Sequence, residues 1–282
     1  MNNGRDGTGW DADLWKRIDQ AVHGEALDSK VAAKFLPRVD LPGATTVPAD
    51  LINTATMTVD EGAVVALVEI WVEFALTAQQ VTGEEDLRTG ENLATRATNL
   101  LSQAEDILIF QGQSGVDNRL FTSGTVQIRS GPTWAGLLNA TTQVIPVPSL
   151  VAGQHKYGEN TFGAVAQGYS LLQSTGHYGA YALVLQTDEY ADTYAPLPST
   201  LITPADRIKP LVTSGFYGTG TLPPFRGVMV SLGGNTMDLV MGLEPATMFV
   251  QIDAQGLYRF RVTERFALRV KDSTAIVRFE FQ

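Results

Sequence analysis

The sequence predicts an α+β protein with one small α/β unit inside it. A long helix is indicated over residues 91–112, where apolar residues recur every three or four positions and Gly112 follows as a natural stop. The closing stretch LYRFRVTERFALRVKDSTAIVRFEFQ alternates apolar with polar side chains, which is the period of a strand. Between these two signals, helical and strand patterns alternate over residues 162–206.

The composition is that of an ordinary soluble protein. Of the 282 residues, 44% are hydrophobic and 18% are charged, which is enough apolar surface for a sizeable core. The lack of cysteine excludes disulfides and thiolate sites, and with the polar N-terminus it predicts a cytoplasmic location. A net charge of −10 disfavours non-specific binding to nucleic acid or to anionic lipid. The longest apolar stretch, residues 62–76, carries Glu69 and Glu73, so no membrane span is predicted.

The first fifty residues are expected to form an arm that lies on another part of the protein or on a neighbouring subunit. Residues 11–23 have the pattern of an amphipathic helix, with Asp11 or Asp13 available as the N-cap. A second helix is predicted over residues 27–35. Several prolines then force an extended crossing, so the segment is too thin to form a core alone.

Strands are predicted on both sides of the long helix. Residues 52–77 are rich in Val, Thr, Ile, Trp and Phe, and with a turn at residues 60–62 they predict a long hairpin. In the middle third, a helix over residues 162–176 is followed by a strand over residues 181–185 and by helix starts at Thr187 and Thr203. Strands return after Arg226, with GGN at 233–235 expected as a hairpin turn.

The sequence offers little for catalysis. His23, His155 and His177 share no metal-ligand spacing, and no nucleophile elbow, phosphate loop or dinucleotide motif follows a strand. Glu105 and Asp106 form an acidic pair without a neighbouring base, which we interpret as a helix-surface position or an intersubunit contact. We therefore predict no catalytic residue, no cofactor and no metal.

Four short motifs, in order along the chain, resemble those of a known family. WKRID at 15–19 resembles the helix that opens encapsulin chains, and AEDILIFQG at 104–112 resembles the family's E-D-x-x-I-F-x-G at the end of a long helix. GAYALVL at 179–185 is similar to its G-P-Y-x-L-V strand, and FRVTERF at 260–266 is similar to its closing strands. The chain therefore resembles the encapsulins, bacterial and archaeal shell proteins with the fold of tailed-phage major capsid proteins (Hong Kong 97-like).

The resemblance implies a division of the chain. It comprises an N-terminal arm over residues 1–50, an extended hairpin (E-loop) over 51–79, a peripheral domain with the long spine helix over 80–130 and 225–282, and an axial domain over 131–224. The chain departs from the family pattern at residues 32–35, where AAKF replaces Gly-Arg-(Arg/Lys)-Phe, and at Ala180, where the family has proline. The first departure lies near the place where the family docks its cargo.

The function implied by the resemblance is structural. Many copies, in multiples of sixty, would close into an icosahedral nanocompartment. The shell would enclose a cargo protein, such as a ferritin-like protein or a dye-decolourising peroxidase, bound through its terminal peptide. The alternatives are a viral major capsid protein that packages DNA, and a protease. Since no lysine lies between Lys34 and Lys156, the hairpin cannot supply the lysine that some phage shells cross-link.

Three groups of residues are candidates for these roles, and for the first two the alternative is ordinary packing within the subunit. The cargo-docking candidates are Leu14, Trp15, Ile18, Lys34 and Phe35. The candidates for packing between subunits are Val64, Leu67, Trp71, Phe74 and Leu76. The candidates for lining a pore are Tyr194, Pro196, Pro198, Ser199 and Thr200. The arginines of the closing strands are expected to face neighbours or cargo, namely Arg259, Arg261, Arg265 and Arg269.

Overall fold

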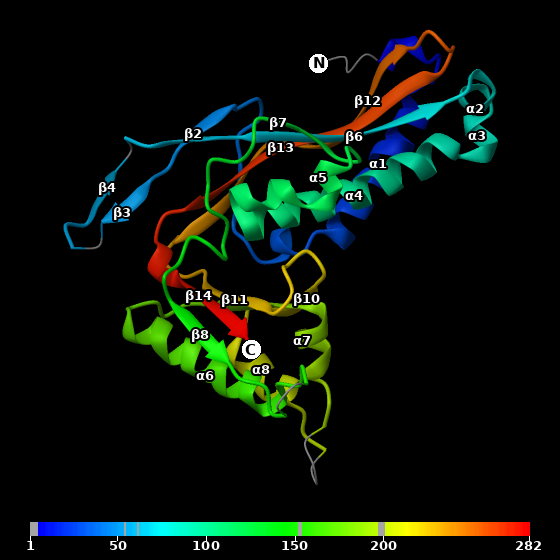
Figure 1. Cartoon of the computed structure of the whole chain (residues 1–282). Coiled ribbons are helices and arrows are strands. Elements are labelled where there is room, and N and C mark those ends of the chain that lie inside the picture. Colours follow the sequence, from blue (N-terminus) through cyan, green and yellow to red (C-terminus); the bar gives the residue numbers. More distant parts are fainter. Residues whose placement is uncertain (1–4, 54, 61, 152–153, 197–200) are drawn as a thin grey trace.

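Two five-stranded sheets, each covered by helices, organise the chain (Figure 1). The computed structural model describes residues 5–53, 55–60, 62–151, 154–196 and 201–282. A narrow ribbon projects sideways from the first sheet, and the second sheet lies below it in the view of Figure 1. The mixture of helices and strands confirms the predicted α+β class.

The first sheet has the strand order β1-β12-β13-β6-β7, in which only β1 and β12 are parallel. Its strands are β1 Arg38–Asp40, β6 Val68–Leu76, β7 Gln127–Arg129, β12 Met237–Ile252 and β13 Tyr258–Val270. Strands β12 and β13 form a long bulged hairpin, and Phe260, Phe266 and Leu268 of β13 are fully buried. The alternation of the closing stretch therefore buries one apolar face, as the sequence predicts.

Two long helices, α1 (Ala12–Ser29) and α4 (Thr89–Gln111), lie side by side against this sheet (Figure 1). Asp11 caps α1 by accepting a hydrogen bond from the Leu14 amide, and the buried carboxylate of Glu84 accepts the amides of Gly90 and Glu91 at the start of α4. Short elements complete the unit: η1 Arg5–Gly7, η2 Ala32–Lys34, α2 Ala78–Thr82, α3 Glu84–Leu87, η3 Gly112–Asp117 and α5 Arg119–Thr122.

The first helix differs from the prediction. Helix α1 continues to Ser29, and the Lys30 amide still bonds to the Ala26 carbonyl. The separate helix expected over residues 27–35 is therefore wrong, and only the short η2 turn remains of it. The reason is local, because Gly24 is tolerated inside the helix and nothing between it and Leu27 breaks the hydrogen-bond pattern.

The projecting ribbon consists of two short antiparallel pairs. β2 (Thr46–Pro48) pairs with β5 (Val64–Ala66), and β3 (Leu51–Asn53) pairs with β4 (Thr58–Asp60). The expected turn at residues 60–62 is wrong, because the chain reverses between β3 and β4. There, the Asn53 side chain accepts the amides of Ala55 and Thr56.

The second sheet has the order β10-β9-β11-β14-β8. Its strands are β8 Val144–Val147, β9 Tyr181–Gln186, β10 Gly215–Thr219, β11 Arg226–Ser231 and β14 Ile276–Phe281. Helices and turns around it are α6 Gly158–Ser174, α7 Thr187–Asp192, α8 Pro204–Ile208, η4 Lys209–Leu211 and η5 Ser273–Ala275. The predicted start of α8 is confirmed by a capping box between Thr203 and Asp206, with Pro204 in the first turn.

The chain crosses between the two sheets where the sequence predicted local hairpins or one continuous sheet. GGN at 233–235 does not join a hairpin, because β11 lies in the second sheet and β12 in the first. The closing strands also separate, with β13 in the first sheet and β14 in the second. The sequence assigns residues 225–282 to one domain, but β11 and β14 lie in the second sheet and β12 and β13 in the first.

Candidate functional site

A cavity of about 190 Å³ opens between the C-terminal half of α1 and strand β12. Apolar side chains form much of its wall: Ala26, Leu27, Leu239, Met241 and Pro245. Exposed charged or polar side chains stand around it, namely His23, Lys34, Arg38 and Glu244. The buried residues Lys30 and Glu105 also line it, so the cavity combines an apolar wall with a buried ionic group.

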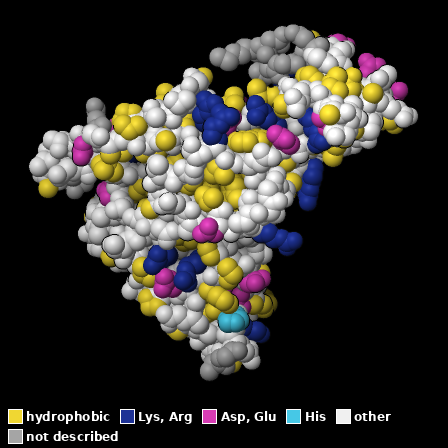
Figure 2. All heavy atoms as spheres, turned by 45° about the horizontal axis from the view of Figure 1, so that its top comes forward, with side chains coloured by type: hydrophobic (Ala, Val, Ile, Leu, Met, Phe, Trp, Pro, Cys, Tyr) yellow, Lys and Arg dark blue, Asp and Glu magenta, His cyan; other side chains and the backbone are white. Residues whose placement is uncertain are grey.

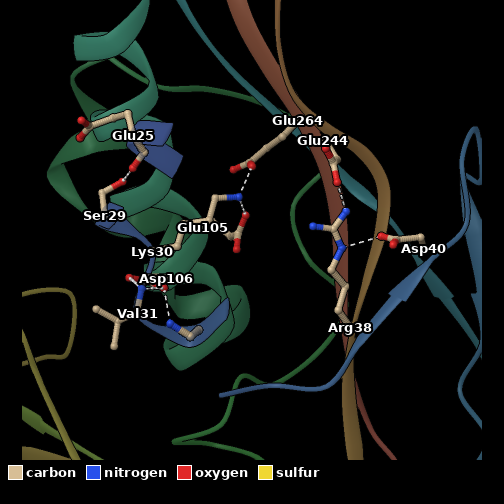
Figure 3. A network of polar contacts seen from close by, with 11 residues as sticks. Glu25, Ser29, Lys30, Val31, Arg38, Asp40, Glu105, Asp106, Glu244 and Glu264 are labelled. Atoms are coloured by element: carbon tan, nitrogen blue, oxygen red, sulfur yellow. Dashed lines mark hydrogen bonds and ion pairs between the residues drawn. The ribbon is translucent and has the colours of Figure 1, made fainter. Parts of the chain in front are cut away.

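The buried ionic group, Lys30 with Glu105 and Glu264, joins three elements (Figure 3). Lys30 is the residue that follows α1. Its ammonium donates one hydrogen bond to Glu105 of α4 and a second, at 2.6 Å, to Glu264 of β13. Both carboxylates are fully buried. Among the described residues, Oε1 of each carboxylate has no hydrogen-bond partner. When both acids are ionised, the group therefore carries one excess negative charge.

Asp106 holds the chain just after Lys30. Its carboxylate accepts hydrogen bonds from the Val31 and Ala32 amides, both at 2.9 Å. These two amides lie just beyond the end of α1. Acids on neighbouring positions of α4 thus bind consecutive residues of the arm. This arrangement fixes the point at which the arm leaves α1 (Figure 3).

The pKa values in this group follow from burial. Burial raises the pKa of Asp106 to about 7, against the two backbone hydrogen bonds that lower it. Burial and then repulsion from Glu105 raise the pKa of Glu264 well above its ordinary value, in spite of Lys30. Burial alone would lower the pKa of Lys30, but the two carboxylates outweigh it and the pKa is raised. The ammonium therefore stays charged, and it is the acids of the group that gain or lose protons.

A second ionic group stands across the cavity. Arg38 of β1 binds Asp40 and Glu244, and Figure 3 shows it on the far side of the space from Glu105. Like Lys30, this cation is shared by two acids. Lys34 donates its own hydrogen bond to the Asp28 carbonyl at the end of α1.

The structure divides the cargo-docking candidates. Leu14, Trp15, Ile18 and Phe35 are buried in the larger hydrophobic core, where Phe35 stacks on Tyr217 of β10 at 5.9 Å. Lys34 is exposed and lines the cavity. Of this group, Lys34 alone is placed where a docked segment could touch it.

The candidates for packing between subunits lie on two elements. Val64 is 62% exposed on the ribbon, whereas Leu67 and Leu76 are buried in the first unit. Trp71 is half-buried between the guanidinium groups of Arg129 and Arg261, and Phe74 stacks on Phe260 at 5.3 Å.

The ribbon exposes further apolar side chains that the sequence reasoning did not single out, namely Leu51, Met57 and Val59 (Figure 2). Their signal in the sequence is the run of strand formers on either side of the Asn53 turn.

Of the pore candidates, Tyr194 and Pro196 lie among the described residues, just after α7 of the second unit. Tyr194 is 40% exposed, shares a hydrogen bond between hydroxyls with Tyr190, and lies under the Lys209 ammonium. Pro196 is exposed. Pro198, Ser199 and Thr200 lie outside the described residues.

The closing arginines are mostly paired within the chain. Arg259 binds Asp253, Arg265 binds Glu69 at 2.9 Å, and the buried Arg269 binds Asp238 and Asp50. The expectation that all four face neighbours or cargo is therefore wrong, because these side chains neutralise acids of adjacent strands and of the ribbon.

Sequence reasoning identified Glu105 and Asp106 as an acidic pair but assigned them to the wrong environment. They are buried in the first unit, so the interpretation as helix-surface residues is wrong. The signal was available, because Glu105 lies four residues after Leu101 and three before Leu108, on the apolar stripe of the helix.

Within the described ranges, no cluster of three or more His, Asp or Glu side chains could hold a metal ion, and no helix is long and apolar enough to cross a bilayer.

Solved structures show which class of fold this is. A virus-like particle protein from Pyrococcus furiosus matches with a TM-score of 0.67 and 15% identity, over 94% of this chain and 99% of that one. The capsid protein of Myoviridae phage XM1 matches with a TM-score of 0.57 and 13% identity, over 86% and 87%. The fold is therefore that of tailed-phage capsid proteins.

Sequence comparison places the chain within that class. The model of the family described as "Encapsulating protein for peroxidase" matches residues 1–267, and the chain belongs to this family. It is also 29% identical, over 187 residues, to the type 1 encapsulin shell protein EncA of Myxococcus xanthus. That match covers 66% of this chain and 58% of the relative.

Proposed function

We propose that this protein is the subunit of a closed, icosahedral shell that encloses a cargo protein. The observation that carries the proposal is the projecting ribbon. A two-stranded ribbon is marginal in water, and this one leaves Leu51, Met57, Val59 and Val64 exposed at 43%, 84%, 52% and 62%. Neighbouring copies would cover these side chains, and the capsid fold supplies a symmetric arrangement in which each copy can do so.

We assign the two units to the two domains of such a subunit. The unit on the first sheet would be the peripheral domain and the unit on the second sheet the axial domain, whose far loops surround symmetry axes. Strands β11 and β14 go with the axial unit, because both lie in the second sheet. Tyr194 and Pro196 would then stand near an axial pore.

The cavity beside α1 is our candidate for cargo docking. Its apolar wall suits an aliphatic side chain of an extended terminal peptide, and Lys34 and Arg38 stand beside it. The family description names a peroxidase as the enclosed protein, which supports a peroxidase as cargo here. A ferritin-like protein is the other cargo that the sequence resemblance implies. In this proposal Lys34 stays in the docking site, whereas Leu14, Trp15, Ile18 and Phe35 support it from the core.

Electron microscopy of the purified protein tests the shell. We expect round, hollow particles of uniform size, and a stable monomer at micromolar concentration would contradict the proposal. Mass spectrometry of material inside the particles tests the cargo. One enzyme with an extended terminal peptide supports a cargo compartment, whereas packaged DNA would identify a viral capsid instead.

A further inference from the structure

The cavity beside α1 contains an incompletely satisfied acid. Glu105 lines the cavity, its side chain is fully buried, and its Oε1 atom has no hydrogen-bond partner among the described residues. Its Oε2 atom is taken by the Lys30 ammonium. Figure 3 shows the second oxygen of Glu105 turned away from that ammonium. A protonated Glu264 can donate to Glu105, but once Glu264 is ionised the buried Glu105 oxygen is unfavourable until it gains another donor.

The charges around the cavity favour a positively charged donor. Lys30 is shared by Glu105 and Glu264, and Arg38 is shared by Asp40 and Glu244. Each of these two cations thus faces two acids. With Lys34 counted as the third cation, the four acids exceed the cations by one charge when Glu264 is ionised, and they balance when Glu264 holds a proton. The remaining titratable side chains that line the cavity are His23 and Lys34, and Asp106 lies next to Glu105 on α4.

We propose that the segment which docks in this cavity inserts a lysine or arginine side chain, and that Glu105 is the acid that binds it. The inference rests on the proposed docking function and specifies the chemistry of its partner. The aliphatic stem of such a side chain would lie against Leu239, Met241 and Pro245 while its charged end meets Glu105. A neutral apolar side chain would fill the same wall but leave the Glu105 oxygen unpaired.

A proton competes with this cation. In the empty cavity, burial and repulsion from Glu105 raise the pKa of Glu264, so Glu264 holds a proton at pH values where an exposed glutamate has lost it. A cation at Glu105 removes the need for that proton and releases it. Cation binding should therefore strengthen as the pH rises through the raised pKa of Glu264.

The test uses assembled wild-type particles and two small probes, n-pentylammonium and 1-pentanol, which differ mainly in charge. Saturation-transfer NMR suits weak ligands on very large particles. We expect n-pentylammonium to bind more tightly than 1-pentanol, and Glu105→Gln to weaken the ammonium about tenfold while changing the alcohol less than twofold. Equal binding of the two probes, or no effect of Glu105→Gln, would overturn the inference.

Two further variants locate the acid. Glu264→Gln removes the acid whose proton competes with the cation, so the pH dependence of ammonium binding should become smaller than in the wild type, with only the contribution of Asp106 remaining. Glu244→Gln removes an acid from the opposite wall and should change ammonium binding less than twofold. A larger loss there than in Glu105→Gln contradicts the assignment.

Electron microscopy of the same samples separates the two proposals. Closed particles that take 1-pentanol without preferring the ammonium refute the cation site alone, and the absence of particles refutes the shell.

Discussion

Three buried acids converge on three consecutive residues at the end of α1. Glu105 and Glu264 bind the Lys30 side chain, and Asp106 binds the Val31 and Ala32 amides. Buried charges contribute little net stability unless every partner is present, but removing one partner is strongly destabilising. The acids therefore specify where the arm leaves α1 more than they add to the total stability.

Asp106 makes stability depend on pH. Its pKa is about 7 in the folded protein, and an unfolded aspartate has the ordinary value of 3.8. A raised folded pKa means that the stabilisation is present below the unfolded pKa and is lost as the pH rises through the folded one. Relative to Asp106→Asn, the wild type should thus lose on the order of a few kcal/mol between pH 4 and pH 8. Denaturant unfolding of both proteins at these pH values measures the difference, and a difference that does not change with pH contradicts it.

Arg269 joins the ribbon to the first sheet through a buried fork. It binds both oxygens of Asp238 at 2.8 Å and one oxygen of Asp50 at 2.5 Å. Arg269→Ala would leave the buried Asp238 with Lys271 alone, so we expect a loss of about 3–5 kcal/mol in the free energy of unfolding. Asp50→Asn is the matched control, because Asp50 is 31% exposed and its loss should cost less than about 1 kcal/mol. If the two variants lose similar amounts of unfolding free energy, the contact of Arg269 with Asp238 contributes no more than its contact with Asp50.

At the scale of elements, the ribbon is folded by its own turn but is not stabilised by its own packing. We expect Val59→Asp to leave the first unit folded and to prevent assembly, because it places a charge where a neighbour would pack. Thr58→Asp is the comparison for the opposite face of the ribbon, since adjacent residues of a strand face opposite sides. That face carries Leu51 among the polar residues Asn53, Thr58 and Asp60, so we expect a smaller effect on assembly there. Light scattering gives the particle size and circular dichroism reports the fold. Normal particles from Val59→Asp would contradict the role of this face.

Elements with a complete local signal were predictable, and those defined by distant partners were not. The helix α4 was found almost to the residue, because its apolar spacing and Gly112 are local features. The ribbon turn was misplaced, since Asp60 and Gly62 also resemble a turn and do form a local contact. The placement of β14 in the second sheet was not predicted, because it depends on pairing with β8 and β11, which are far away in sequence.

Residues at the candidate site show the same limit. The apolar pattern of α1 correctly marked Leu14, Trp15 and Ile18 as one face, but it could not distinguish a face buried in the subunit from a docking face. Glu105 was misread because an acid on an apolar stripe has meaning only once its partners, Lys30 and Glu264, are known. Those partners lie on other elements, and sequence spacing does not reveal them.

At the scale of the whole molecule, the two units meet where the chain crosses between the sheets. Gln111 of α4 donates a hydrogen bond to the Thr221 carbonyl of the second unit, and Phe35 stacks on Tyr217 of β10 at 5.9 Å. Gly179 and Gly233 bring two backbone segments into direct contact there. In a closed shell the angle between the units must be the same in every equivalent copy, so a tight junction favours a uniform particle.

The glycine contact can be tested directly. A Cβ atom at Gly179 would lie 2.6 Å from the Gly233 backbone, so Gly179→Ala should push the segments apart and cost about 1–3 kcal/mol. The matched control is Gly163→Ala on helix α6, where a Cβ meets nothing within 4 Å and alanine should stabilise the helix by about 0.5–1 kcal/mol. Thermal melting should separate the two variants in opposite directions, and micrographs of Gly179→Ala should show fewer closed particles of uniform size. If Gly179→Ala melts at or above the wild type and forms normal particles, the junction tolerates displacement and the angle between the units is set by contacts with neighbouring subunits.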